Sequence, residues 1–332
     1  MAVLGARGSS TMWISVRYHD VPAAVNSFSE EISPLLAKDE LIAIRYYVSE
    51  KIGQGSFGQI YRGIDKMKER AVAIKVEPLV KKGDKINDPR RLVLEQNVLI
   101  ALRNKPNIPL IYASGRTNKG YPYIIMQMLG KNLTDLRKKR VEKRFTPSTA
   151  FRVAEQISTA LQHLHEAAFI HRDVKPTNCC LGAVPDVKHV YLIDFGMCRR
   201  FRADNGKWRP LRKKAPFKGT IRYASLNALR LHECGPVDDL IGWLYSCIEI
   251  TLSKLPWAKS TPREMLHMKE NMSAEEVCAQ MPPPFVECYN YISRLKSTEF
   301  PEHVRMHKWL RDCRPPNTET DDPFDWEAEH LI

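Results

Sequence analysis

One stretch of the chain decides how the rest of the sequence is interpreted: His171-Arg172-Asp173-Val174-Lys175-Pro176-Thr177-Asn178. We call it the opening loop. Asn178 follows Asp173 by five positions, so a single loop can present a carboxylate and an amide to one phosphate. In such a loop the aspartate can accept a hydroxyl proton while the amide holds a metal ion. Lys175 lies between them and can neutralise charge on a phosphoryl group. The alternative is a polar surface loop that fits the pattern by chance, so partners are needed elsewhere.

Composition indicates a large globular protein with an acidic partner. The chain has 332 residues, 43% of them hydrophobic, which suits two lobes or two domains with a real core. Its formal net charge of +13 favours nucleic acid, an anionic surface, or an acidic or phosphorylated protein as partner. No aromatic-plus-basic RNA signature and no finger spacing is present, so we expect no specific nucleic acid.

Cysteine spacing and hydropathy indicate where in the cell we expect the protein. The eight cysteines form neither a zinc pattern nor a disulfide framework, so we interpret them as reduced thiols. The best apolar run, 241–252, is too short for a membrane span and contains Glu249. We also find no secretory signal. We expect a cytoplasmic or nuclear monomer that does not contact a membrane.

A glycine-rich hairpin precedes the opening loop. Residues 47–52 alternate like a strand, G-x-G-x-x-G follows, and the alternation then resumes. Between two strands this motif folds over the phosphates of ATP, whereas the strand–helix version binds dinucleotides. Any Cβ on the glycines would hold the backbone away from the phosphates. A plain glycine hairpin is the alternative. The predicted nucleotide contacts are Ile52, Gly53, Gln54, Gly55, Ser56, Phe57, Gly58, Gln59 and Ile60.

The next strand, Val72-Ala73-Ile74-Lys75, ends in a lysine that needs an anion. The α- and β-phosphates of ATP would serve, with Ala73 also lining the nucleotide site. Glu95 falls beside the apolar stripe of an expected helix at 92–102 and is the candidate ion-pair partner of Lys75. The alternatives are a lysine that reaches solvent and a solvated glutamate.

A hinge is expected where the strand at 123–126 ends in Gln127-Met128-Leu129-Gly130. Met126 would stand at the back of an adenine pocket, and Gln127 and Leu129 would give main-chain bonds to the base.

A metal site is expected after a further strand at 190–193, which delivers Asp194-Phe195-Gly196. Asp194 lies 16 residues past Asn178, so a short hairpin can return it to the same site. Magnesium prefers carboxylate and phosphate oxygens. We predict that Asp194 and Asn178 hold Mg²⁺, with Phe195 packing to fix the aspartate.

Five motifs therefore stand in one order: glycine hairpin, strand lysine, helix glutamate, H-R-D loop and D-F-G. This set resembles that of the protein kinases over about 46–310. The resemblance implies an α+β bilobal fold, with a small antiparallel-sheet N-lobe (46–126), a hinge (127–130) and a mainly helical C-lobe (131–310). Residues 1–43 would form a partly disordered extension that could dock on the first lobe, and 311–332 a short tail.

The resemblance also implies an activity: transfer of the ATP γ-phosphate to Ser or Thr hydroxyls of protein substrates. The catalytic residues would be Asp173, Lys175, Asn178, Lys75 and Glu95. Where the family usually has A-P-E, this chain has Gly219-Thr220-Ile221-Arg222-Tyr223-Ala224-Ser225-Leu226-Asn227, which resembles the casein kinase 1 superfamily. Phe324-Asp325-Trp326-Glu327 and other short motifs look most like its tau-tubulin kinase branch. By resemblance, Asp239 should cap the H-R-D loop from a buried helix.

The segment between Asp194 and Thr220 contains no Ser, Thr or Tyr. Many kinases order this segment by phosphorylation, which creates an arginine–phosphate pair. We therefore expect activity without phosphorylation of this segment. Its many basic residues could receive an acidic or already phosphorylated substrate, or form a solvated charge run. The candidate anion-binding residues are Arg212, Lys213, Lys214, Lys218 and Arg222.

Two other functions remain open at this point. The first is a catalytically silent ATP-binding scaffold, a pseudokinase, against which the presence of Lys75, Asp173 and Asp194 argues. The second is a module that binds an acidic polymer, which the net charge permits.

Overall fold

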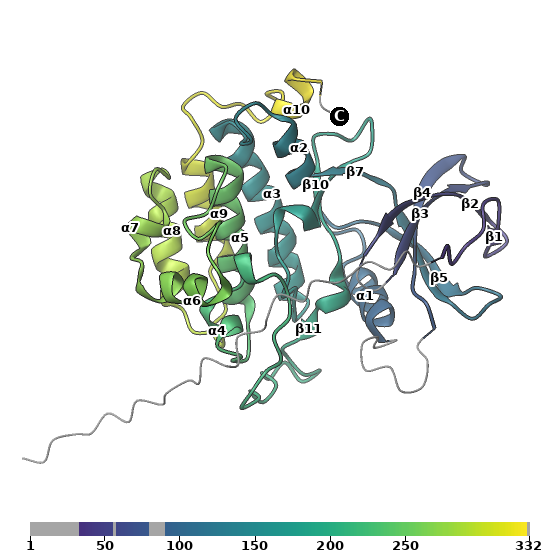
Figure 1. Ribbon diagram of the computed structural model, residues 1–332, viewed down its shortest axis with the longest axis horizontal. Helices are drawn as coiled ribbons and strands as arrows, with labels where there is room; N and C mark the ends of the chain where they lie inside the picture. The colour runs from purple at the N-terminus through teal and green to yellow at the C-terminus, as the bar shows by residue number, and fades with distance from the viewer. Residues whose placement is uncertain (1–32, 56–57, 80–89, 331–332) are drawn as a thin grey trace, which may run out of the picture.

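The structure, a computed structural model, describes residues 33–55, 58–79 and 90–330. Figure 1 shows a small lobe built on a β-sheet beside a larger lobe built mainly of helices. The predicted bilobal α+β fold is therefore confirmed. Ser56, Phe57 and residues 1–32 of the expected extension lie outside the described residues.

The small lobe has one antiparallel sheet within the described residues. Its strands are β1 (Leu41–Ile42), β2 (Tyr46–Gln54), β3 (Gln59–Asp65), β4 (Arg70–Val76), β5 (Ile111–Arg116) and β6 (Pro122–Gln127). They lie in the order β1-β2-β3-β4-β6-β5. Helix α1 (Arg90–Ala101) packs its buried Leu92, Val98 and Leu99 into the main core.

Alternation along β4 gives the two faces of this sheet different partners. Val72, Ile74 and Val76 are fully buried in an outer cluster that also contains Leu35 and Leu36. Successive side chains of a strand point to opposite faces, so Lys75 points to the inner face. The segment 33–42 thus covers the outer face, and the inner face is left for α1 and the candidate site.

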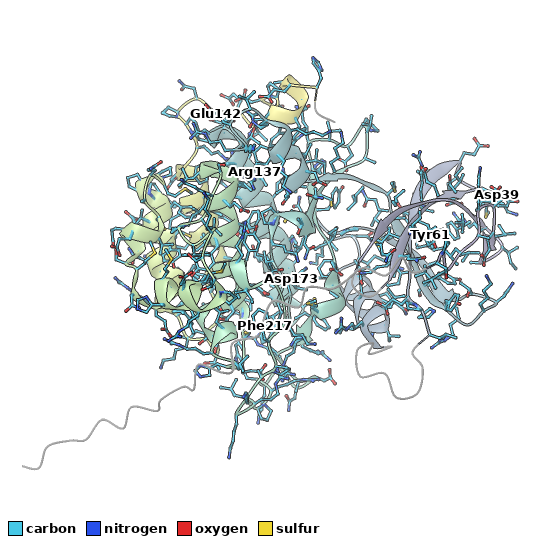
Figure 2. The ribbon with its side chains drawn as sticks, in the orientation of Figure 1. Asp39, Tyr61, Arg137, Glu142, Asp173 and Phe217 are labelled. Carbon is cyan, nitrogen blue, oxygen red and sulfur yellow. The ribbon has the colours of Figure 1, made fainter. Side chains whose placement is uncertain are left out.

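The outer face also takes the side chain of Gln59, which we predicted among the nucleotide contacts. Gln59 is 1% exposed; its amide oxygen accepts from the Leu35 N–H at 2.9 Å, and its amide nitrogen donates to the Ser33 carbonyl at 3.1 Å. Tyr61, labelled in Figure 2, accepts from the same Leu35 N–H at 2.9 Å. The Gln59 side chain therefore anchors 33–36 to the sheet, so any contact of Gln59 with a nucleotide must come from its main chain.

The large lobe gathers its helices around α5 (Pro236–Leu252), which is buried along nearly its whole length. Trp243 of this helix donates its indole N–H to the Ala154 carbonyl of α3 (Pro147–Glu166) at 3.0 Å. The other helices are α2 (Leu133–Lys139), α4 (Leu226–Leu229), α6 (Pro262–Asn271), α7 (Ala274–Val277), α8 (Pro283–Arg294), α9 (His303–Asp312) and α10 (Asp325–Ala328).

Short strands in this lobe bring the ends of the predicted metal hairpin together. One sheet contains β7 (Leu129–Asn132), β9 (Cys179–Gly182) and β10 (Val190–Leu192); a second pairs β8 (Phe169–Ile170) with β11 (Arg199–Arg200). Directly beyond the β9–β10 pair, the Ile193 N–H donates to the Asn178 carbonyl at 2.9 Å. This bond places Asp194, the next residue, close to Asn178.

Residues 322–326 pack against α3 and its surroundings. Trp326 is fully buried, and its indole N–H donates to the Val187 carbonyl at 3.0 Å. The Arg152 guanidinium stacks 3.9 Å from the Phe324 ring centroid and donates to the Asp322 carbonyl at 2.6 Å. The segment expected as a tail therefore contributes to the core. Among the described residues, no helix combines the length and apolar character needed to cross a bilayer.

Candidate active site

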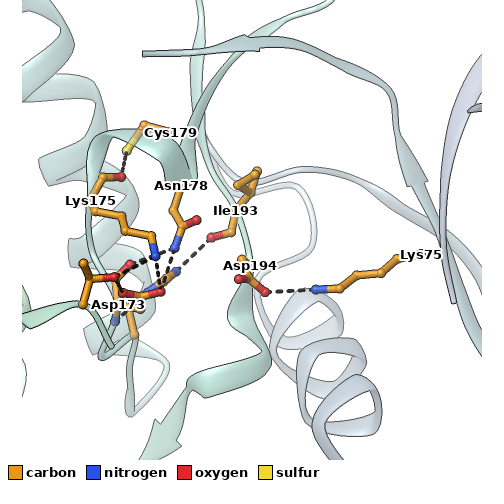
Figure 3. A network of polar contacts seen from close by, with 9 residues as sticks. Lys75, Asp173, Lys175, Asn178, Cys179, Ile193 and Asp194 are labelled. Carbon is orange, nitrogen blue, oxygen red and sulfur yellow. Dashed lines mark hydrogen bonds and ion pairs between the residues drawn. The ribbon is translucent and has the colours of Figure 1, made fainter. Parts of the chain in front are cut away.

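The Lys75 ammonium joins the two lobes. It lies 2.6 Å from Glu95 Oε2 on α1. It also lies 2.9 Å from Asp194 Oδ1 of the large lobe, a contact shown in Figure 3. The predicted Lys75–Glu95 ion pair is confirmed, and Asp194 is a second partner of the same ammonium. Glu95 is 3% exposed, whereas the Asp194 side chain is 42% exposed and can meet a ligand.

Lys75, Glu95 and Asp194 shift one another's pKa values. Burial disfavours the charged ammonium, but Asp194 and Glu95 outweigh burial and raise the pKa of Lys75 above its ordinary value. The Lys75 charge lowers the pKa of Asp194. Burial raises the pKa of Glu95, opposed by Lys75. Lys75 is therefore a permanent cation and Asp194 a permanent anion near neutral pH.

The opening loop places a second polar group, shown on the left of Figure 3. Lys175 Nζ lies 2.8 Å from Asp173 Oδ2, and the Asn178 amide nitrogen donates to the Asp173 carbonyl at 2.8 Å. Thr220 donates its hydroxyl to Asp173 Oδ1 at 2.9 Å and accepts from Lys175 Nζ at 2.8 Å. Thr220 was missed because only its position after Gly219, far along the chain, could have signalled it.

Asp239 of α5 holds this loop from beneath, as the resemblance predicted. One carboxylate oxygen accepts from the His171 N–H at 2.6 Å, and the other accepts from the Arg172 N–H at 2.8 Å. His171 packs edge-on against Phe195, with ring centroids 5.4 Å apart, and donates Nε2–H to the Ile193 carbonyl at 3.0 Å. The H-R-D loop and the segment carrying Asp194 are therefore fixed to each other, and Phe195 packs as predicted.

The glycine hairpin lies over β4. A Cβ on Gly58 would come within 2.4 Å of the Val76 carbonyl oxygen, so only glycine allows this approach. Gly53 pairs with Ile60 across β2 and β3, and the Gly55 N–H donates to the Gly58 carbonyl at 2.9 Å. Ile60 is half-buried and pairs with Lys75, whose side chain reaches the charged group.

The hinge joins β6 to β7. Met126 pairs with Ala73, so these two predicted nucleotide contacts are neighbours. The Gln127 N–H donates to the Leu110 carbonyl at 2.8 Å, so any main-chain bond from Gln127 to adenine must use its carbonyl. Leu129 pairs with Gly182 of β9, which ties the hinge to the strand that follows the opening loop.

The residues at the predicted metal site suit magnesium. Asp194 receives Lys75 on Oδ1 and has a second carboxylate oxygen. Asn178 uses its amide nitrogen to reach the Asp173 carbonyl, which fixes the side chain with its amide oxygen as the remaining acceptor. Hard oxygen donors of this kind, together with phosphate oxygens, are what Mg²⁺ prefers.

Two of the five predicted anion-binding residues are committed to structural ion pairs. Arg212 binds Glu233 through Nε at 2.6 Å and Nη2 at 2.9 Å, and Arg222 Nη1 lies 3.1 Å from Glu249 Oε1. Each of these two guanidinium groups faces a buried carboxylate, so a substrate anion would have to share it with that partner. Lys213 and Lys214 are exposed and Lys218 is half-buried.

Comparison with known proteins agrees with this geometry. The family profile described as a protein kinase domain matches residues 46–304. A probable serine/threonine-protein kinase of Dictyostelium discoideum is 34% identical over 297 residues, which cover 88% of this chain and 58% of that protein. A putative casein kinase I of Caenorhabditis elegans is 32% identical over 298 residues, 88% of this chain and 86% of that protein. The chain thus spans little more than half the length of the first relative.

The substitution Gly219→Ala tests how closely residues 219–220, the Thr220 segment, pack against the opening loop. The φ of Gly219 is +103°, and a Cβ there would lie 2.3 Å from the Arg172 carbonyl oxygen. Gly219→Ala must therefore displace Thr220 or Asp173, and a misplacement near an ångström costs on the order of 10²-fold in kcat. The measurement is the rate of phosphoryl transfer from ATP to a peptide.

Gly206→Ala is the matched control. Gly206 also has a positive φ, +76°, but a Cβ there meets nothing within 4 Å among the described residues. We expect Gly206→Ala to keep full activity. Equal activity of the two variants would contradict the placement of the Thr220 segment.

Proposed function

Because the chain belongs to the protein kinase family, we propose that it transfers the γ-phosphate of ATP to serine and threonine hydroxyls of protein substrates. The observation that carries this proposal is the convergence of Lys75, Asp194 and Asp173 on one site from both lobes (Figure 3). The names of the two relatives support the choice of serine and threonine.

Each side chain has a task that its surroundings support. Asp173 orients the substrate hydroxyl and accepts its proton, with Thr220 and Lys175 fixing its two carboxylate oxygens. Lys75, held by Glu95, binds the phosphates. Asp194 and Asn178 would hold magnesium, which would supply positive charge to neutralise the phosphates. The glycine hairpin, Ala73, Met126 and the main chain of Gln127 and Leu129 enclose the nucleotide.

A silent pseudokinase remains the alternative within the family. Nothing that the chemistry requires is missing, since Lys75, Asp173, Asn178 and Asp194 are all present and adjacent. A module for an acidic polymer is the alternative outside it. A salt-dependent mobility shift with duplex DNA, in the absence of kinase activity, would favour that second function.

We further propose membership of the casein kinase 1 superfamily, nearest to its tau-tubulin kinase branch. The residues that replace A-P-E have a physical role that supports this: the Ser225 hydroxyl donates to Asp238 Oδ1 at 2.5 Å, and the Asn227 amide donates to it at 3.2 Å. Asp238 lies in the first turn of α5, so this carboxylate ties the end of the segment to the central helix.

Activity without phosphorylation of the 195–219 segment is supported by a carboxylate already in place. Glu233 binds Arg199 at 2.9 Å and Arg212 at 2.6 Å, as a phosphate group would bind two arginines. Burial opposes its ionisation, but Arg212 and Arg199 hold the pKa of Glu233 below its ordinary value. Arg172 meanwhile donates to the Met197 carbonyl at 2.7 Å.

A cytoplasmic or nuclear location and a monomeric state also remain proposals. All eight cysteines are unpaired, as reduced thiols would be, and all but Cys234 are buried. This supports a reducing compartment.

Asp173→Asn tests the central assignment. The amide cannot accept the hydroxyl proton, so kcat should fall on the order of 10²–10⁴-fold while ATP binding persists. Phosphate transfer to casein or a serine peptide, together with nucleotide titration, measures both. Near-native turnover would refute the role of Asp173, and inactive wild-type protein that still binds ATP would favour the pseudokinase.

Glu233→Gln tests the internal substitute for phosphorylation. Removing the charge shared by two arginines should lower kcat/KM by about tenfold, since charge-assisted hydrogen bonds of this kind are lost. Phosphatase treatment should leave the wild-type value unchanged. Asp204→Asn, which removes the exposed partner of Arg200, is the control and should have no effect. Loss of wild-type activity after phosphatase treatment would overturn the proposal.

The preference for acidic or phosphorylated substrates is tested with paired peptides that differ only in an upstream phosphate or acidic run. We expect higher kcat/KM for the charged peptide, and a smaller ratio in Lys213→Ala, because Lys213 is an exposed cation of this segment. Lys254→Ala, an exposed lysine elsewhere in the lobe, is the control. Equal kcat/KM for both peptides would end the idea.

A further inference from the structure

A buried lysine outside the charged site has no carboxylate partner in the part of the chain that the structure describes. Lys269 lies in the last turn of α6 and is 6% exposed. Its Nζ donates to three main-chain carbonyls, those of Ala224 at 2.7 Å, Arg222 at 3.1 Å and Ile221 at 3.2 Å. Among the described residues, no ion pair involves it; burial alone lowers its pKa, to about 7.

Burying an ammonium without a counter-ion costs free energy unless its donors are all used. Here three hydrogen bonds use the three N–H donors, and Nζ also lies 4.7 Å from the ring centroids of both Tyr245 and Trp257. An apolar side chain of the same length would avoid the cost. The choice of a hydrogen-bond donor at this buried position therefore points to the three carbonyls as the reason for Lys269.

The carbonyls belong to one tight turn. Ile221–Tyr223 form a 3₁₀ helix, in which the Ala224 N–H donates to the Ile221 carbonyl at 3.3 Å. The Arg222 and Ala224 carbonyls, toward the end of the turn, receive side-chain donors instead. Lys269 supplies donors to that end, and the Trp257 indole N–H donates to the Arg222 carbonyl at 2.9 Å. The turn is thus held from α6 and from the loop after α5 at once.

This turn is continuous with the candidate active site. It begins directly after Thr220, which bonds both Asp173 and Lys175. A cavity beside Asp173 is lined by Thr220, Tyr223 and Ala224 as well. A shift of the turn would therefore move the wall of this cavity and the hydroxyl that fixes Asp173.

We propose that Lys269 is a positioning residue for the protein substrate: it holds the 221–224 turn as the surface on which the substrate chain lies next to Asp173. The inference rests on the proposed kinase function. The contacts of Lys269 within the described part of the chain are with the 221–224 turn and the rings of Tyr245 and Trp257, so its effect should fall on the protein substrate and not on ATP.

The test compares steady-state kinetics of wild type, Lys269→Met and Lys269→Arg with a serine peptide. Lys269→Met leaves the carbonyls without a charged donor and should lower kcat/KM for the peptide by about tenfold or more. KM for ATP should stay within about twofold, because uniform binding of the nucleotide is untouched. Lys269→Arg should recover part of the loss, and Lys254→Met is the control on an exposed lysine.

Trp257→Phe provides a second variant should Lys269→Met fail to fold, as judged by thermal denaturation. It removes one donor to the Arg222 carbonyl while keeping an aromatic ring, and should change the same parameter in the same direction. Unchanged peptide kinetics, or equal losses for peptide and ATP, would overturn the role of Lys269. Inactive wild-type protein would instead overturn the proposed function.

Discussion

The ion pairs of the Lys75 ammonium with Glu95 and Asp194 are the interactions on which the rest of the structure depends. A cation beneath a β-sheet is tolerated only if anions surround it, and the chain supplies Glu95 from one helix and Asp194 from the other lobe. Satisfying this one charge therefore draws α1 toward the sheet and fixes the small lobe against the large one. Asp194 stays more exposed than its partners, and this leaves a carboxylate available to a bound metal.

The large lobe uses buried charges in a related way, to hold irregular backbone. Asp239 accepts from two consecutive N–H groups of the H-R-D loop, and Glu233 binds two arginines of the 195–219 segment. Lys269 donates to three carbonyls of the 221–224 turn. Irregular backbone leaves main-chain groups without helix or sheet partners, and Asp239 and Lys269 satisfy such groups from α5 and α6. The H-R-D loop is thus positioned by a carboxylate of the buried helix α5.

Much of this arrangement could be predicted from the sequence because the motifs encode short-range geometry. A lysine closing an apolar strand, a glutamate on the next helix and a D-F-G after a short hairpin have few ways to meet. Strand alternation also contained the signal that Gln59 faces away from Lys75, since Gln59 shares its face with Tyr61 and Val76. The resemblance to glycine-loop motifs led us to include it nonetheless.

The rest could not be predicted because it depends on contacts between distant residues. A count of basic residues cannot separate a solvated cation from Arg212 or Arg222, whose carboxylate partners lie 21 and 27 positions away. Thr220 lies in a motif that we used only to assign the family branch, and Lys269 carries no local pattern that marks it. Their roles emerge only once the 221–224 turn is seen against α6 and the opening loop.

The most direct measurement is the affinity of Lys75→Met for ATP and for adenosine, each compared with wild type. If the ammonium serves the phosphates, ATP binding should weaken by on the order of tenfold or more while adenosine binding is kept, since only ATP offers the charge that Lys75 meets. Adenosine binding also reports that the variant is folded. Unchanged ATP affinity, or equal losses for both ligands, would contradict the assignment of Lys75 as the phosphate anchor of this site.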